Sequence, residues 1–122
     1  MDDRDRQIID RIRSEIKIIS EMLDGIDFDD FVSDEKTRRA VCMTLINIGE
    51  LVKNLTDKFK EKNNDIKWRD IAGLRDITAH KYQTLRIEDI WETIKQDIPV
   101  LCKQTENLKF NGSQNNNGEK NE

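Results

Sequence analysis

The sequence has few of the residues that break helices, cross-link chains or bind metals. Among 122 residues it has one proline, five glycines, one histidine and two cysteines, Cys42 and Cys102. One histidine and two distant cysteines cannot build a zinc site within one chain, so we expect reduced, buried thiols. Phosphate-loop and G-x-G-x-x-G motifs are missing as well. We therefore expect no metal and no cofactor.

Long apolar stretches are also missing, which bears on location. No apolar run approaches the ~20 residues that a bilayer-spanning helix needs. The beginning, Met1-Asp2-Asp3-Arg4-Asp5, is acidic and lacks the apolar core of a signal peptide. We expect a cytoplasmic protein with no membrane partner, and the length fits one domain.

What the sequence does have is charge, with 38% charged against 35% hydrophobic residues, a balance typical of helices with narrow apolar stripes. Apolar spacings of three and four predict an all-α, up-down bundle of four main helices at about residues 3–23, 34–60, 68–79 and 87–108. An extra short helix is compatible with this pattern. We expect residues 1–110 to form the domain and 111–122, which lack apolar residues apart from glycine, to be disordered.

Several local signals set the expected boundaries of these helices. Residues 26–32 read as a connector whose Phe28 and Phe31 pack on the bundle, and Ser33 reads as the N-cap of the second helix. That helix carries a near-heptad apolar seam, made of Val41, Leu45, Ile48, Val52, Leu55 and Phe59. Its Gly49 costs about 1 kcal/mol relative to alanine, which often marks close helix approach. Pro99 predicts a kink near residues 95–97.

The side chains best suited to chemistry gather in one octapeptide, residues 75–82. His80 is the one histidine and Tyr82 the one tyrosine, and Arg75 lies five positions before the histidine. The histidine can exchange protons near neutral pH, and the arginine presents a planar fork of donors for phosphate oxygens. The tyrosine hydroxyl can donate, accept or be modified. This inventory suits phosphoryl chemistry.

The charge distribution is compatible with a nucleic-acid substrate only locally. The net charge of −4 argues mildly against wholesale nucleic-acid binding. The stretch from residue 67 to 86 is nevertheless basic, with five cations (Lys67, Arg69, Arg75, Lys81 and Arg86) against Asp70 and Asp76. Ordinary solvated helix surface would explain any one of these cations equally well.

The motif Arg75-x4-His80-x-Tyr82 resembles the signature of HEPN-type toxins, specifically the HepT-like toxins paired with MNT nucleotidyltransferase antitoxins in type VII systems. Asp76 fits the polar residue that follows the arginine in that family. Asn47-Ile48-Gly49-Glu50 and the approach from Trp68 to Leu74 also resemble family segments. Together these likenesses extend over nearly the whole predicted domain.

This resemblance implies a two-fold homodimer that cleaves RNA without a metal. Arg75 and His80 would be the catalytic pair, with Asp76 and Glu50 in supporting positions. Tyr82 would be the residue that the cognate antitoxin adenylylates to block the toxin. Glu50 reads either as a carboxylate facing the active cleft or as a plain surface residue.

The geometry of the motif leaves a second interpretation open. In a continuous α-helix, Arg75 and His80 point about 140° apart, so either the helix unwinds or the arginine side chain reaches round. One histidine per chain also means that a two-histidine mechanism requires two copies. The alternative is a catalytically inactive helical accessory module that binds a nucleotidyltransferase or a nucleotide.

Overall fold

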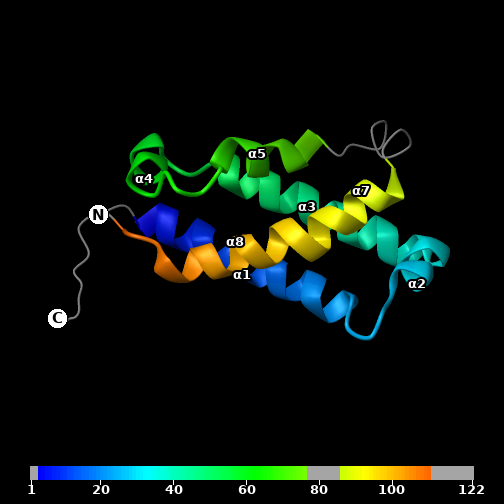
Figure 1. Cartoon of the computed structure of the whole chain (residues 1–122). Helices are drawn as coiled ribbons and strands as arrows, with labels where there is room; N and C mark the ends of the chain where they lie inside the picture. The colour runs from blue at the N-terminus through cyan, green and yellow to red at the C-terminus, as the bar shows by residue number, and fades with distance from the viewer. Residues whose placement is uncertain (1–2, 77–85, 111–122) are drawn as a thin grey trace.

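A computed structural model describes residues 3–76 and 86–110 of the chain, and every regular element in these two stretches is helical (Figure 1). This confirms the predicted all-α class. In chain order the α-helices are α1 (Asp3–Met22), α2 (Phe28–Ser33), α3 (Glu35–Lys53), α4 (Asp57–Lys62), α5 (Trp68–Ala72), α7 (Ile87–Glu92) and α8 (Ile98–Gln104). Three tighter or wider helical segments follow α5, α7 and α8: the 3₁₀ turn η1 (Gly73–Asp76), the π-helical turn η2 (Thr93–Asp97) and the 3₁₀ turn η3 (Thr105–Asn107).

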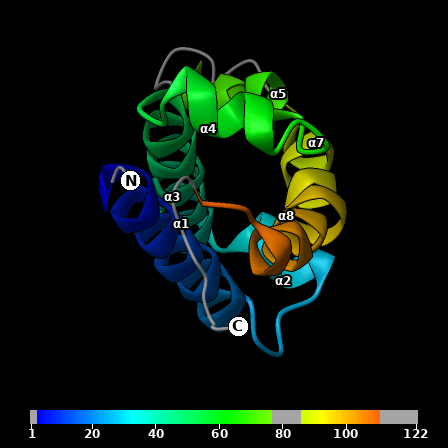
Figure 2. The ribbon, with the colours of Figure 1, turned by 90° about the vertical axis from the view of Figure 1, so that its left-hand side faces the viewer.

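The core forms where α1, α3 and the α7–α8 arm meet. Figure 2, an end-on view, places α1 and α3 on one side, α8 on the other, and α4 and α5 across the top. The predicted apolar stripes face inward, and all six residues of the α3–α4 seam are buried. On α1 the spacing of three and four predicts Ile8 on the inward stripe, with Ile12, Ile16, Ile19 and Leu23, but Ile8 is only half-buried and its neighbour Ile9 is buried. Burial of these apolar stripes makes the main favourable contribution to the free energy of folding.

The second predicted helix is in fact two helices, so the prediction of one continuous helix over 34–60 was wrong. α3 ends at Lys53 and α4 begins at Asp57. The buried carboxylate of Asp5, on α1, accepts hydrogen bonds from the Thr56 amide at 2.9 Å and the Thr56 hydroxyl at 2.7 Å. The same hydroxyl accepts from the Phe59 amide and thereby caps α4. A partner 51 residues away therefore stabilises the break.

The start of α3 also differs from the prediction. Asp34, and not Ser33, is the N-cap, because its carboxylate accepts hydrogen bonds from the Thr37 amide at 3.1 Å and the Thr37 hydroxyl at 2.6 Å. These bonds, led by the one from the hydroxyl, lower the pKa of Asp34. Ser33 instead ends α2, where its hydroxyl donates to the Asp30 carbonyl.

The predicted connector over residues 26–32 is largely the short helix α2. Asp27 and Asp30 form a reciprocal capping box, each carboxylate accepting from the other's backbone amide, which stabilises the first turn. Phe31 is completely buried, and its ring centroid lies 5.1 Å from that of Trp91. Phe28 approaches the same tryptophan edge-on at 5.8 Å. The prediction that both phenylalanines pack on the bundle is therefore confirmed.

The fourth predicted helix is interrupted where Pro99 suggested a kink. The Ile98 amide donates to the Thr93 carbonyl, five residues back, which defines the π turn η2. Because Pro99 has no amide proton, the Lys95 carbonyl has no partner four residues on, and widening the turn accommodates this. α8 follows and gives way to η3 before residue 108, where the prediction ended the helix.

No helix within residues 3–76 and 86–110 combines the length and apolarity that a bilayer span requires. The predicted disordered tail, 111–122, lies outside the described residues and stays a prediction.

Candidate active site

Arg75 lies on the short turn that follows α5. Trp68 anchors the start of α5, since its ring is buried and its indole N–H donates to the Asn63 carbonyl at 3.0 Å. The α-helical part ends at Ala72, and Gly73 begins the 3₁₀ turn η1, which carries Arg75 and Asp76. The predicted α-helix over residues 68–79 is thus wrong at 73–76, where the weak helix former Gly73 begins a 3₁₀ turn, and residues 77–79 lie outside the described residues.

This turn rests directly on the backbone of α3 at Gly49. A Cβ built on Gly49 would lie 2.4 Å from the Arg75 amide nitrogen, 3.0 Å from the Ala72 carbonyl oxygen and 3.2 Å from the Arg75 Cα. Real Cβ atoms do not approach a backbone nitrogen that closely, so only glycine fits here. The prediction that Gly49 marks a close approach of two helical segments is confirmed.

The side chain of Arg75 extends from this contact towards Glu50. Its Nη1 atom lies 3.6 Å from the Oε2 atom of Glu50, and both side chains are about half exposed. An exposed pair of this kind contributes less than about 1 kcal/mol to folding. The pair does favour one position of the guanidinium. The structure thereby brings together two of the five predicted site residues, Arg75 and Glu50.

Of the other three predicted site residues, the structure describes Asp76 alone. Asp76 is exposed and directly follows Arg75 on η1. His80 and Tyr82 lie outside the described residues, so their position relative to Arg75 stays a prediction. The α-helical premise behind the 140° separation no longer holds, because Arg75 itself is on a 3₁₀ turn.

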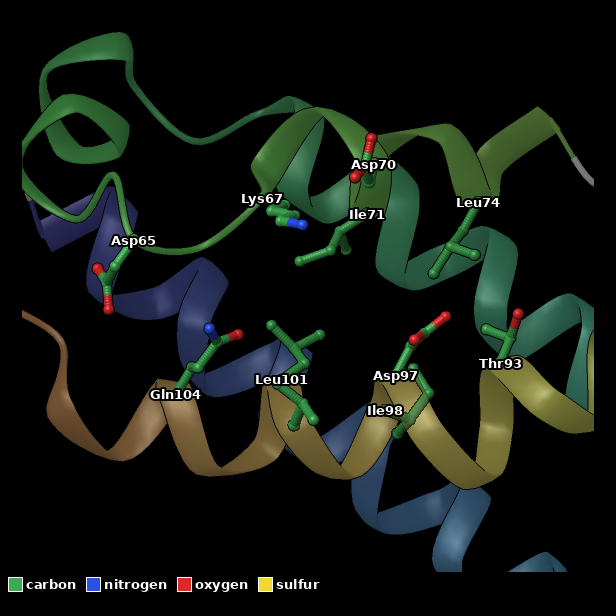
Figure 3. Close-up of a pocket in the computed structure, with 11 residues that line it drawn as sticks. Asp65, Lys67, Asp70, Ile71, Leu74, Thr93, Asp97, Ile98, Leu101 and Gln104 are labelled. Carbon is green, nitrogen blue, oxygen red and sulfur yellow. The ribbon is translucent and has the colours of Figure 1, made fainter.

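An apolar groove of about 350 Å³ runs between α5 and the η2–α8 arm (Figure 3). Ile71 of α5 and Leu74 of η1 point across it towards Ile98 and Leu101. Charged and polar side chains surround this floor, namely Asp65, Lys67, Asp70, Thr93, Asp97 and Gln104. Three carboxylates against one cation disfavour a nucleic-acid phosphate, so this groove is a poorer candidate for RNA binding than the surface around Arg75. No sequence pattern indicated this groove, because most of its lining comes from two predicted helices whose pairing is a tertiary property.

The turn that carries Arg75 contains no cysteine, and the described residues form no metal-binding cluster there. Among the residues with described positions, no three histidine, cysteine or acidic side chains cluster as metal ligands. Burial raises the pKa of Cys42 to about 11, which keeps that α3 thiol protonated. Cys42 is buried as predicted, whereas Cys102 is exposed on α8, against the prediction. Neither belongs to α5 or η1.

Comparison with known proteins decides the family. The HepT-like ribonuclease family matches residues 12–108, which include α3, α5 and the whole octapeptide. The chain belongs to the HepT-like ribonuclease family. This confirms the resemblance inferred from the motif, and it makes the chain an enzyme, an endoribonuclease.

Individual relatives agree with the family assignment. A protein named "Putative RNase" from Caldanaerobacter subterraneus is 41% identical over 103 residues, covering 84% of this chain and 92% of its own. "Probable ribonuclease HepT" from Thermococcus cleftensis is 36% identical over 104 residues, covering 85% and 94%. No solved structure matches the chain significantly.

Proposed function

We propose that this HepT-like chain is the toxin of a HEPN/MNT toxin–antitoxin system and cleaves RNA without a metal ion. Arg75 and His80 would be the catalytic pair, and adenylylation of Tyr82 by the partner nucleotidyltransferase would neutralise it. The main support for the proposal is the position of Arg75 on the backbone of α3. Its backbone rests on Gly49 and its half-exposed guanidinium stands at the start of the motif that contains His80 and Tyr82.

The chemistry would be attack of the ribose 2′-oxygen on the adjacent phosphorus. A base takes the 2′-OH proton, the new P–O bond forms, the bond to the 5′-oxygen breaks, and an acid protonates that leaving oxygen. The products are a 2′,3′-cyclic phosphate and a 5′-hydroxyl. His80 would serve as base or acid, and Arg75 would stabilise the negative phosphorane between them.

One histidine per chain supports a homodimeric site. A two-fold dimer that places both motifs along one groove supplies two copies of His80 and two of Arg75, so base and acid can both be imidazoles. Two-fold pairing is the commonest symmetry of soluble oligomers. In this proposal the RNA lies at the seam of the dimer.

The regulatory part of the proposal concerns the Tyr82 hydroxyl. The partner would transfer AMP from ATP to the phenolic oxygen, with release of pyrophosphate. The added nucleotide places bulk and negative charge where the RNA phosphate must lie, and repulsion blocks binding. Mass spectrometry after incubation with the cognate partner and ATP should find AMP on Tyr82 in the wild type and none in Tyr82→Phe. An unmodified Tyr82 contradicts this part.

The central test compares purified wild type with Arg75→Ala and His80→Ala on RNA in the presence of EDTA. Losing the proton-transfer group or the phosphate clamp should reduce the cleavage rate by roughly 10²–10⁴-fold. Circular dichroism checks that each variant is folded. If the wild type is no more active than His80→Ala, the inactive accessory module that binds a nucleotidyltransferase or a nucleotide is the better description.

A further inference from the structure

We propose that Gly49 and Glu50 of α3 are positioning residues that place Arg75 for catalysis. Gly49 fixes the arginine backbone, and Glu50 orients its guanidinium. The proposal rests on the function proposed above, because it assigns to α3 the task of placing the phosphate clamp.

The backbone half of the proposal follows from what surrounds Gly49. Two of the three nearest atoms to a Cβ at this position belong to the backbone of Arg75, at 2.4 and 3.2 Å. A flexible side-chain end could turn aside from an added methyl group, but a backbone amide cannot without moving its whole turn. The missing Cβ therefore sets the position of Arg75.

The two sides of this contact differ in how firmly they are held. Ile48, directly before Gly49 on α3, and Val52, three residues after it, are completely buried in the core. On η1, Leu74 is only half-buried and Arg75 is exposed. An added Cβ would therefore displace η1 and leave α3 in place, and the arginine would move with the turn.

The side-chain half follows from the ion pair. Glu50 is the residue next to Gly49, and its Oε2 atom lies 3.6 Å from Nη1 of Arg75. A guanidinium has five N–H donors in a rigid plane, so one carboxylate at Nη1 fixes the direction of the whole group. The remaining N–H donors can still bind a phosphate. Because both side chains are half exposed, the pair acts on orientation far more than on folding.

The test uses two glycines that lie at the same turn. Gly49→Ala places a methyl group against the Arg75 backbone, whereas Gly73→Ala adds one where nothing lies within 4 Å, on a residue with φ of −64°. Displacing a catalytic group by about 1 Å can cost 10²-fold in rate. We expect Gly49→Ala to lower kcat by 10- to 100-fold with KM changed less than about threefold, and Gly73→Ala to stay within twofold. A folded Gly49→Ala protein with wild-type kcat overturns the proposal.

Glu50 provides a second test should Gly49→Ala fail to fold, because a half-exposed side chain can be replaced without loss of the fold. Glu50→Ala and Glu50→Gln should lower kcat about tenfold at an unchanged melting temperature. Glu50→Asp, which keeps the charge, should recover part of that loss. Wild-type kcat in Glu50→Ala overturns the role of Glu50.

Failure of this inference and failure of the proposed function are distinguishable. If the wild type and Arg75→Ala cleave RNA equally, the proposed function fails. The positioning claim is then measured by amide hydrogen exchange in the peptide spanning residues 73–76, which Gly49→Ala should accelerate and Gly73→Ala should not. Unchanged exchange in Gly49→Ala overturns the positioning claim by itself.

Discussion

Removing the Asp5 carboxylate should destabilise the fold far more than its place in the first two turns of α1 suggests. Asp5 is 4% exposed and accepts hydrogen bonds from the backbone and side chain of Thr56. Asp5→Ala leaves that amide and hydroxyl without their partner in a half-buried position. The break between α3 and α4 loses the contact that ties it to α1.

The size of the effect can be estimated from these two bonds. A hydrogen bond to a charged group contributes about 1.5–3 kcal/mol. Thr56 is half-buried, which favours the lower end, and removing a buried charge recovers part of its desolvation cost. We expect Asp5→Ala to lower the free energy of unfolding by about 2–3 kcal/mol. Thr56→Ala should cost about 2 kcal/mol, because it removes the α4 cap and one bond to Asp5.

Urea unfolding followed by circular dichroism measures these values, and the double variant measures the coupling. Thr56→Ala keeps its backbone amide, so the coupling reports the hydroxyl–carboxylate bond alone and should be about 1 kcal/mol. The matched control is Asp10→Ala, which removes an exposed carboxylate from the same helix and should change stability by less than about 0.5 kcal/mol. Equal stabilities of the Asp5→Ala and Asp10→Ala proteins would refute the reasoning.

Three further predictions follow from single residues. Gly25 has φ of 75°, so Gly25→Ala should cost about 1 kcal/mol in unfolding free energy by urea denaturation, and an unchanged midpoint would contradict this. Iodoacetamide at pH 8 should modify the exposed Cys102 in the native protein, while Cys42, whose pKa burial raises to about 11, should react only after denaturation. The Thr37 bonds lower the pKa of Asp34 in the folded state, so its stabilisation is present above the unfolded pKa and is lost as pH falls through the folded pKa. The melting temperatures of wild type and Asp34→Asn should therefore differ at neutral pH and converge in acid, and a constant difference would rule out this linkage.

Local signals predicted much of this fold because they describe what each segment must bury. The apolar seam of α3 and α4 was recognisable from Val41 to Phe59, and all of its members are buried. Pro99 predicted the irregular turn before α8, because proline lacks the amide proton of a regular helix whatever the helix packs against. The sequence indicated that Gly49 lies at a close contact between helical segments, but it did not indicate that the partner is the backbone of Arg75.

The mispredicted boundaries share a different cause. The apolar seam keeps its spacing at Leu55, between α3 and α4, so periodicity alone could not reveal that α3 ends at Lys53. Ser33 and Asp34 are both good N-caps, and the choice between them depends on the helix α2 that comes before. α5 ends at Ala72, before the weak helix former Gly73, although the apolar spacing continues to Leu74.

The sequence by itself determined the helical class, the buried faces, the Arg75-x4-His80-x-Tyr82 motif and hence the family. These properties depend on residue type and spacing along the chain. Only the tertiary structure decided that Asp5 binds Thr56, 51 residues away at the break between α3 and α4, and that the backbone of Arg75 rests on Gly49 beside Glu50. The reason is physical: hydrogen-bond partners and close backbone contacts are chosen among groups that become neighbours only after the helices have packed.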